Sequence, residues 1–254
     1  MDVVLLGSGN VATHLAKALK AKGENVIQVY SQNLDNAKLL ANELSAEAIS
    51  NYTDLNNKAD LYIISVKDDA IDEVAAQLKN VRGLVVHTSG TTDINVLSKH
   101  GLRSGVFYPL QTFSKGKSVS FDNIPLCIEA ENETDLNKLE KLANTLSNKV
   151  YNLDGEKRKV LHLTAVFACN FPNHLYALAA KILDSNQLEF DILRPLIFET
   201  ADKVMTNLPI NVQTGPAVRD DQNTINKHLN MLNNLPELQD IYQTLSNSIK
   251  ITHK

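Results

Sequence analysis

The first residues whose types and spacing suggest chemistry are Gly7, Gly9 and Ala12, near the start of the sequence. A short apolar run, Val3–Leu6, precedes them, and a helical pattern, Val11–Ala21, follows them. A strand that breaks at glycines into a helix can hold a dinucleotide pyrophosphate. The first glycine allows a tight turn, the second lets the phosphates approach the main chain, and the small third residue lets helix and strand pack closely. A tight strand–helix turn without a ligand is the alternative.

The residues after the next apolar run, Val26–Tyr30, bear on which dinucleotide would bind. NAD sites usually end this strand with a carboxylate that binds the ribose 2′-hydroxyl. Here Ser31, Gln32 and Asn33 follow, and the first carboxylate is Asp35. This neutral loop leaves space for a 2′-phosphate, so we predict NADP in preference to NAD, although the usual arginine is missing. A polar cap for the following helix is an alternative that is compatible with the same residues.

Three later strand ends carry polar residues, and ligands of open α/β sheets bind at the carboxyl ends of the strands. The first holds Ser65, Val66 and Lys67, which should pass the ribose and the diphosphate of a cofactor. The second, HTSGTT, holds Thr88 and Ser89, whose hydroxyls can bind a substrate or a nicotinamide carboxamide. The third begins at Tyr108. Helix capping by Asp68–Asp69 and a glycine turn capped by Thr92 are the structural alternatives.

Polar residues interrupt an apolar helical stretch in the second half of the chain, at His162, Asn170 and His174. His162 can donate a proton near neutral pH. A buried Asn170 needs partners, which a nicotinamide or a substrate carbonyl can supply. The alternative is that all three are satisfied interior groups or lie on the exposed side, and for His174 we favour it. The sequence contains no HxxxH, HExxH or Cys/His cluster, so we predict no metal site.

The segment QTGPAVRDD, residues 213–221, is the second distinctive motif. A Gly-Pro turn delivers Arg219 and two carboxylates to the start of a helix, which Asp220 or Asp221 can cap. Arg219 can bind a substrate carboxylate with two hydrogen bonds. Pairing of Arg219 with Asp220 or another acidic side chain as a scaffold is the alternative.

Alternating strands and helices position these residues in the first half of the chain. The alternation predicts a doubly wound, mostly parallel α/β sheet of the Rossmann type. The expected strands are Val3–Leu6, Val26–Tyr30, Ala46–Ser50, Leu61–Ser65, Leu84–His87, Gly105–Tyr108, Pro125–Ala130 and Val150–Leu153, and the expected helices are Val11–Ala21, Asn36–Leu44, Ala70–Leu78 and Thr134–Leu146.

No strand pattern follows residue 154, and the remainder predicts an all-α domain. The expected helices are Leu161–Leu183, which Pro172 should kink or divide, Asp191–Met205 with Pro195 in its first turn, Thr224–Leu232 and Glu237–Ile249. We therefore expect a nucleotide-binding domain over residues 1–153 and a helical domain over residues 154–254, with the active site in the cleft between them.

The composition is ordinary for a globular protein of 254 residues, with 43% hydrophobic and 21% charged residues. A net charge of −4 gives no electrostatic case for nucleic acid or an anionic membrane. No apolar stretch approaches a membrane span. Cys127 and Cys169 lie far apart in apolar contexts, which is typical of reduced, buried thiols in a cytoplasmic protein.

Taken together, the segments GSGNVA, ISVKDDAI, HTSG, YPLQTF and TGPAVRDD resemble a family of two-domain Rossmann proteins assigned as NADP oxidoreductases. Their first domain is like that of deazaflavin-dependent NADP oxidoreductases and pyrroline-5-carboxylate reductases, and their helical second domain has no assigned function. The resemblance implies NADP binding at Gly7, Ser8, Gly9, Asn10 and Val11, with Ser31 near the 2′-phosphate. It also implies a cleft lined by Ser89, His162, Asn170 and Arg219, and a homodimer formed through the helical domain.

Two positions depart from related sequences. The family often has His where this chain has Tyr108, so a proton-transfer role for this residue is not predicted. Related 3-hydroxyacid dehydrogenases place a catalytic Lys four residues before an Asn, where this chain has Val166 before Asn170. The lysine mechanism of those enzymes is therefore not predicted.

The leading hypothesis is an NADP-dependent oxidoreductase that transfers a hydride between the nicotinamide and a small C=O or C=N substrate. In it, His162 or a water handles the proton, Ser89 and Asn170 orient polar atoms, and Arg219 anchors an acidic substrate. A non-catalytic NADP(H) sensor or scaffold is the second hypothesis, because no obvious acid–base dyad is present in the sequence. A methyltransferase-like nucleotide binder is the weakest, because the glycine spacing suits a pyrophosphate.

Overall fold

The computed structural model describes residues 1–114 and 116–253, and the chain divides into two compact units, Met1–Cys169 and Asn170–Lys254. The predicted division after residue 153 lies two residues before the helix α6 (Gly155–Ala165), which belongs to the first unit.

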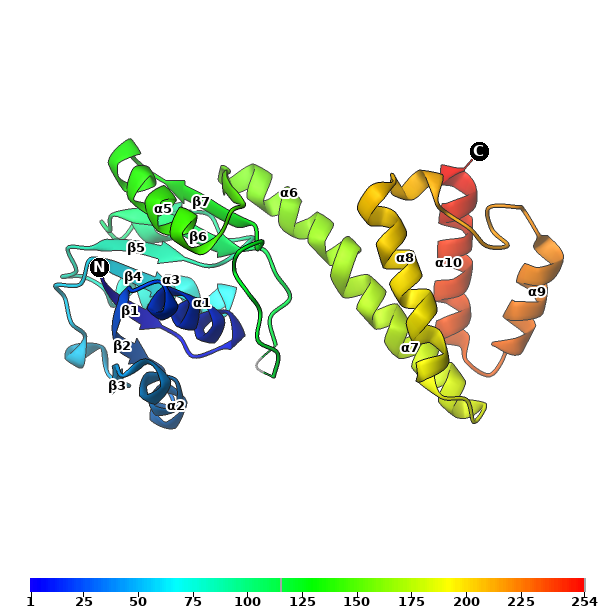
Figure 1. The fold of residues 1–254 in the computed structure, drawn as a ribbon, viewed down its shortest axis with the longest axis horizontal. Helices are drawn as coiled ribbons and strands as arrows, with labels where there is room; N and C mark the ends of the chain where they lie inside the picture. The colour runs from blue at the N-terminus through cyan, green and yellow to red at the C-terminus, as the bar shows by residue number, and fades with distance from the viewer. Residues whose placement is uncertain (115, 254) are drawn as a thin grey trace. The chain divides into compact units, whose positions relative to one another are not determined.

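The first unit is built on one sheet with the strand order β3-β2-β1-β4-β5-β6-β7-β8 (Figure 1). All neighbouring strands are parallel except β6 and β7, which are antiparallel. The predicted mostly parallel, doubly wound α/β fold is confirmed. The strands are β1 (Asp2–Leu6), β2 (Asn25–Tyr30), β3 (Glu47–Ile49), β4 (Leu61–Ile64), β5 (Leu84–His87), β6 (Ser104–Pro109), β7 (Leu126–Ala130) and β8 (Val150–Asn152).

Helices cover both faces of this sheet, and the alternation of side chains along β1 shows why. Val3 and Leu5 point into one core with residues of α1 (Asn10–Ala21), α2 (Leu34–Leu44) and α5 (Glu133–Leu146). Val4 and Leu6 point into a second core with residues of α3 (Ile71–Ala76) and α4 (Asn95–Ser98). Because successive side chains of a strand face opposite sides, a continuous apolar run is buried on both faces.

The turn from β1 into α1 requires glycine at residue 7. Gly7 has φ +126°, and a Cβ atom there would lie 2.1 Å from the Ser65 carbonyl oxygen. The end of β1 therefore approaches the end of β4 too closely for any side chain.

The long apolar helical stretch of the second half is interrupted as predicted. A π-helical turn, η3 (Val166–Asn170), separates α6 from α7 (Phe171–Ser185). Pro172 lies at the start of α7 and has no N–H for the carbonyl one turn earlier, which explains the change of helix type. Cys127 is buried as predicted, but the prediction that Cys169 is buried was wrong, because this turn leaves its side chain exposed.

The second unit is helical, as predicted, with α7, α8 (Arg194–Thr206), α9 (Gln222–Met231), α10 (Pro236–Thr252) and the 3₁₀ turns η4 (Phe190–Leu193) and η5 (Pro209–Asn211). Pro195 lies in the first turn of α8, as expected. The last helix, α10, begins at Pro236, one residue before the expected start at Glu237. Over the described residues, no helix combines the length and apolar character that a membrane crossing requires.

Candidate functional site

A cavity of about 770 Å³ opens where β1, β2, β4, β5 and β6 end, within the first unit. Its lining comes from the loops after these strands and from α6. Thirteen of the predicted site residues line it: Gly7, Ser8, Gly9, Asn10, Val11, Ser31, Gln32, Ser65, Val66, Lys67, Thr88, Ser89 and His162. Residues predicted from the rule that ligands bind at the carboxyl ends of parallel strands therefore line the same cavity.

Gly9 and the beginning of α1 form the floor of the cavity at the glycine turn. No atom lies within 4 Å of the position that a Cβ atom of Gly9 would take. Gly9 also has φ −75° and ψ −172°, which any residue can adopt, so no feature of the protein itself requires glycine here. As the N-cap of α1 it supplies no side-chain hydrogen bond, and the first turn holds no acidic residue. Among the described residues, the main-chain N–H groups and the helix dipole thus remain available for an anion.

The end of β2 presents neutral groups to the cavity. The Ser8 hydroxyl donates to Ser31 Oγ at 3.2 Å, and the exposed Gln32 also lines the cavity. Tyr30 stacks on Tyr52 with ring centroids 4.3 Å apart. Asn33 does not line the cavity, because its side chain accepts from the Asp35 main-chain N–H at 2.9 Å and caps α2. For Asn33 the structure thus shows the capping alternative.

Hydroxyl groups link the ends of β4 and β5 across the cavity. Thr88 donates to Ser65 Oγ at 3.1 Å, and Thr91 donates to Asp68 Oδ2 at 2.5 Å. Ser89 Oγ accepts from the main-chain N–H groups of Thr91 and Thr92 at 3.1 and 3.0 Å. The Ser89 hydroxyl therefore closes the turn, while its residue still lines the cavity. No side chain caps the 3₁₀ turn η2 (Asp68–Ala70) with a hydrogen bond, so the structure does not show the capping alternative for Asp68.

Tyr108 and His162 form a hydrogen-bonded pair at the other end of the cavity. Tyr108 Oη lies 3.0 Å from His162 Nδ1, and both residues line the cavity. Burial raises the pKa of Tyr108 to about 12, so its phenol stays protonated at neutral pH.

A buried ion pair holds the helix that carries His162. Arg158, four residues earlier on α6, is 1% exposed, and its guanidinium pairs with Glu129 of β7. It also donates to the Thr92 carbonyl oxygen at 2.6 Å. Since residues four apart share a helix face, Arg158 fixes the face that presents His162 to the cavity.

Two predicted site residues, Asn170 and Arg219, belong to the second unit and do not line this cavity. Asn170 ends the π-helical turn and is exposed. Arg219 is exposed beside α9, which Asp221 caps by accepting from the Thr224 N–H at 3.0 Å. Asp220 pairs with Lys250 Nζ at 2.5 Å. The predicted capping role of Asp221 is confirmed.

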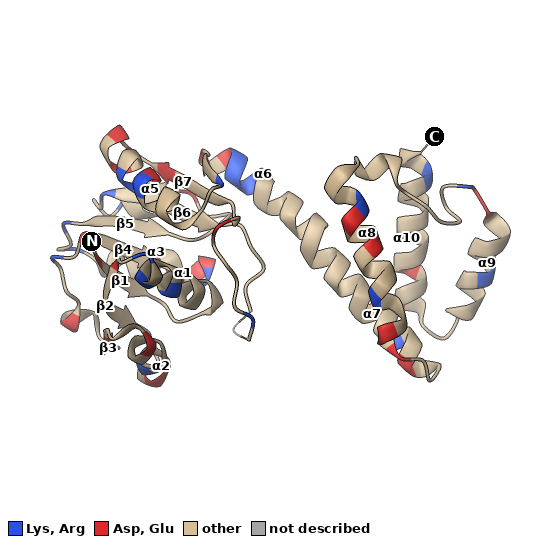
Figure 2. Cartoon of the chain, viewed as in Figure 1, with Lys and Arg blue, Asp and Glu red and all other residues tan. Residues whose placement is uncertain are grey.

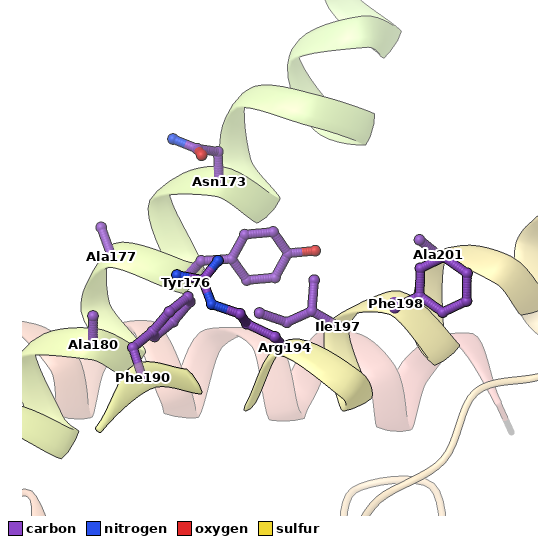
Figure 3. A pocket seen from close by; sticks show the side chains of 9 residues that line it. All are labelled: Asn173, Tyr176, Ala177, Ala180, Phe190, Arg194, Ile197, Phe198 and Ala201. Carbon is purple, nitrogen blue, oxygen red and sulfur yellow. The ribbon is translucent and has the colours of Figure 1, made fainter. Parts of the chain in front are cut away.

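The second unit has its own cavity, of about 640 Å³, between α7 and α8 (Figure 3). Its lining is mostly aliphatic and aromatic, with Tyr176, Phe190 and Phe198 among its members. Arg194 lies over the Phe190 ring, 5.5 Å from the centroid, and donates to Asp191 at 2.6 Å. This cavity has few polar groups that converge on a point, unlike the cavity at the strand ends.

Sequence reasoning missed Tyr52 and Arg158. The spacing of Arg158 and His162 on one helix face was a usable signal for Arg158. Nothing local marks Tyr52, because its contact with Tyr30 depends on how β2 and β3 pair. In the described part of the chain, no group of three or more His, Cys, Asp or Glu side chains is placed to bind a metal ion.

The sheet order and the glycine turn define a Rossmann-type α/β protein with an added helical unit. A family model described as NADP oxidoreductase, coenzyme F420-dependent, matches residues 2–89, and a model of a domain of unknown function matches residues 124–249. A comparison with curated proteins finds no match.

Solved structures extend this likeness over the whole chain. A protein from Bacteroides fragilis, described as a "putative NADP oxidoreductase", is 48% identical, with 98% of this chain and 97% of that chain covered and a TM-score of 0.94. A Thermotoga maritima protein is 22% identical over 99% of this chain and 98% of that chain, with a TM-score of 0.74. A pyrroline-5-carboxylate reductase from Coxiella burnetii shares the fold at 16% identity, 99% and 98% coverage and a TM-score of 0.60.

The chain belongs to the family of NADP oxidoreductase-like proteins that join a coenzyme F420-dependent-type NADP oxidoreductase domain to this helical domain of unknown function. The resemblance expected from the sequence motifs is thereby confirmed.

Proposed function

We propose that the protein is an NADP-dependent oxidoreductase that reduces or oxidises a small C=O or C=N compound. The observation that carries the proposal is the turn at Gly9, where an uncapped helix N-terminus borders the cavity and the space that a Cβ atom would take is open. A pyrophosphate there would take the main-chain hydrogen bonds that α1 leaves unsatisfied. When bound, the nicotinamide supplies the hydride chemistry.

NADP in preference to NAD is part of this proposal. The lining at the end of β2 consists of Tyr30, Ser31 and Gln32, with no carboxylate to bind a ribose 2′-hydroxyl or to repel a 2′-phosphate. The hydroxyls of Ser8 and Ser31 are close enough to share one phosphate oxygen as donors.

The chemistry beyond the cofactor is proposed for two residues that line the cavity. His162 handles the proton, and Ser89 positions a polar atom at the turn after β5.

We also propose that the helical unit forms a homodimer. Only Ala217, Ile225, Leu238 and Ser246 are buried among the described residues from 170 onward, too few for an independent core. Phe198, Met205 and Leu208 are 71%, 80% and 67% exposed. From Val160 to Ala180 the sequence has no Lys, Arg, Asp or Glu, and Figure 2 shows no charged residue on α7 before its last turns. A second copy would cover this apolar surface and the cavity between α7 and α8.

Calorimetric titration with NADPH and NADH tests binding, and loss of NADPH absorbance in the presence of keto acids, aldehydes and cyclic imines tests catalysis. We expect tight NADPH binding and oxidation by at least one compound. Binding without oxidation by any compound would support the alternative of an NADP(H) sensor. No binding of either nucleotide contradicts both functions.

A further inference from the structure

The pair of Tyr108 and His162 joins two elements at the cavity. Tyr108 comes from the end of β6, and His162 comes from α6. Their hydrogen bond is 3.0 Å long, with the rings 6.1 Å apart and tilted by 58°. Over the described residues His162 Nδ1 has this one hydrogen bond, and both side chains border the cavity.

Gly90 leaves room for this pair. A Cβ atom on Gly90 would lie 2.6 Å from His162 Nδ1 and 2.9 Å from Tyr108 Cζ. Those contacts are shorter than real Cβ atoms tolerate, so the HTSG turn after β5 is shaped around the two side chains. The turn that carries Thr88 and Ser89 therefore presents the pair to the same space as those hydroxyls.

The surroundings keep the Tyr108 phenol neutral and leave it in contact with a group that can supply a proton. Burial is the main cause of its raised pKa, and Cys127 on β7 and Asp68 on η2 (Asp68–Ala70) act in the same direction. Arg158 on α6 opposes them. A phenol that gave up its proton here would become an unfavourable buried phenolate unless another donor replaced the proton at once. His162 Nδ1 is the atom placed to do so.

We infer that Tyr108 is the catalytic residue that passes a proton to or from the substrate, and that His162 acts through it as the proton source or sink. This inference rests on the proposed hydride transfer with NADPH. In reduction, the carbonyl carbon gains the hydride and its π electrons move onto oxygen. That oxygen takes the Tyr108 hydroxyl proton, while the phenol oxygen takes the Nδ1 proton of the His162 imidazolium. The products are an alcohol, a neutral His162 and an unchanged Tyr108.

The kinetic test compares the wild type with Tyr108→Phe, His162→Gln and the double variant, with NADPH and glyoxylate, phenylglyoxal or Δ1-pyrroline as probes. We expect each single substitution to lower kcat about 100-fold, a typical general-acid contribution, and KM for NADPH to stay within about 3-fold. The double variant should be no slower than the slower single variant, because the two residues act as one unit. Tyr151→Phe, at an exposed tyrosine, is the matched control.

The pH profile of kcat separates proton relay from packing. The profiles of the wild type and His162→Gln should differ in shape, because the imidazole takes part in proton transfer in the wild type alone. The profile of Tyr108→Phe should match that of the double variant, since solvent supplies the proton in both. A Tyr108→Phe variant that keeps kcat within about 3-fold of the wild type overturns the inference, because general acids contribute far more.

A spectroscopic measurement decides the matter even if none of the three probes is reduced. In the NADP⁺ complex, Tyr108→Phe should move the Nδ1 ¹⁵N resonance of His162, identified by its loss in His162→Gln, and leave the other six histidines unchanged. An unmoved Nδ1 resonance means that the hydrogen-bonded pair does not exist in solution. That result overturns this inference and leaves the proposed function standing. Failure of NADP⁺ to bind would instead contradict the proposed function.

Discussion

At the end of β2, the proposed preference for NADP over NAD depends on one small side chain. Ser31 accepts a hydrogen bond from Ser8 and borders the cavity where an NAD enzyme usually has a carboxylate. We expect Ser31→Asp to weaken NADPH binding at least about 10-fold, by repulsion of the 2′-phosphate, and to strengthen NADH binding. Calorimetric titration with each nucleotide measures both affinities. Ser31→Asn is the neutral control and should leave NADPH preferred; equal losses in both variants would show that the charge is irrelevant.

The lowered pKa of His87 should make the stability of the first unit depend on pH. Burial, with a smaller effect of Arg158, lowers its pKa from the usual 6.5 to about 4, against opposing effects of Asp68 and Asp93. Between these pH values the unfolded chain binds a proton that the native state does not, so stability falls as pH drops from about 6.5 to 4, by up to about 3 kcal/mol.

Urea unfolding at pH 4.5 and pH 7 measures this effect. His87→Asn keeps an acceptor for the Ser89 N–H, which His87 Nδ1 now binds at 3.2 Å, and should remove most of the pH dependence. His174→Asn, at an exposed histidine, should keep it. The same pH dependence in His87→Asn and the wild type would show that His87 is not the group responsible.

At the scale of elements, the buried Arg158 helps to hold α6 to the sheet. Arg158 reaches Glu129 on β7 and the Thr92 carbonyl after β5. Removing one partner of a buried pair leaves a charge without compensation, so Glu129→Gln should cost about 3 kcal/mol of unfolding free energy. Urea unfolding gives the value.

A nearby exposed pair supplies the matched control for that substitution. Lys157 Nζ lies 3.2 Å from Asp154 Oδ2 on the exposed side of the same helix. Lys157→Met should change stability by less than about 1 kcal/mol, as is usual for surface pairs. Similar losses for Glu129→Gln and Lys157→Met would argue against a structural role of the buried pair.

The sequence predicted the strands and helices better than it predicted their tertiary contacts. The alternation of apolar runs and helical patterns predicted all eight strands, and Pro172 predicted the break before α7, because both signals are local. The antiparallel pairing of β6 and β7 was not predicted, since it depends on distant partners. Thirteen residues that line the cavity, Gly7 and Gly9 among them, could be predicted, most of them because strand ends converge at one edge of the sheet. The Tyr108–His162 contact could not, because 54 residues separate its members.

At the scale of the whole molecule, the exposed apolar surface of the second unit predicts self-association. Sedimentation velocity should give a species of twice the 28.1 kDa chain mass. Phe198→Glu should shift it toward monomer, because Phe198 is 71% exposed and lines the cavity of Figure 3. Leu39→Glu changes an equally exposed residue of α2 in the first unit, 68% exposed, and should leave the dimer intact. A monomeric wild type would contradict the proposed dimer.

The central claim is that the turn from β1 to α1 exists to hold a pyrophosphate, and Gly9→Ala tests it most directly. Its backbone angles suit alanine and no atom lies within 4 Å of the added Cβ, so the variant should melt within about 2 °C of the wild type. NADPH affinity, measured by calorimetry, should nevertheless fall at least about 10-fold, because the methyl group would occupy the space of the phosphates. Gly116→Ala, at a second glycine with open surroundings but outside this cavity, should bind NADPH like the wild type. Unchanged NADPH affinity in Gly9→Ala would contradict the account.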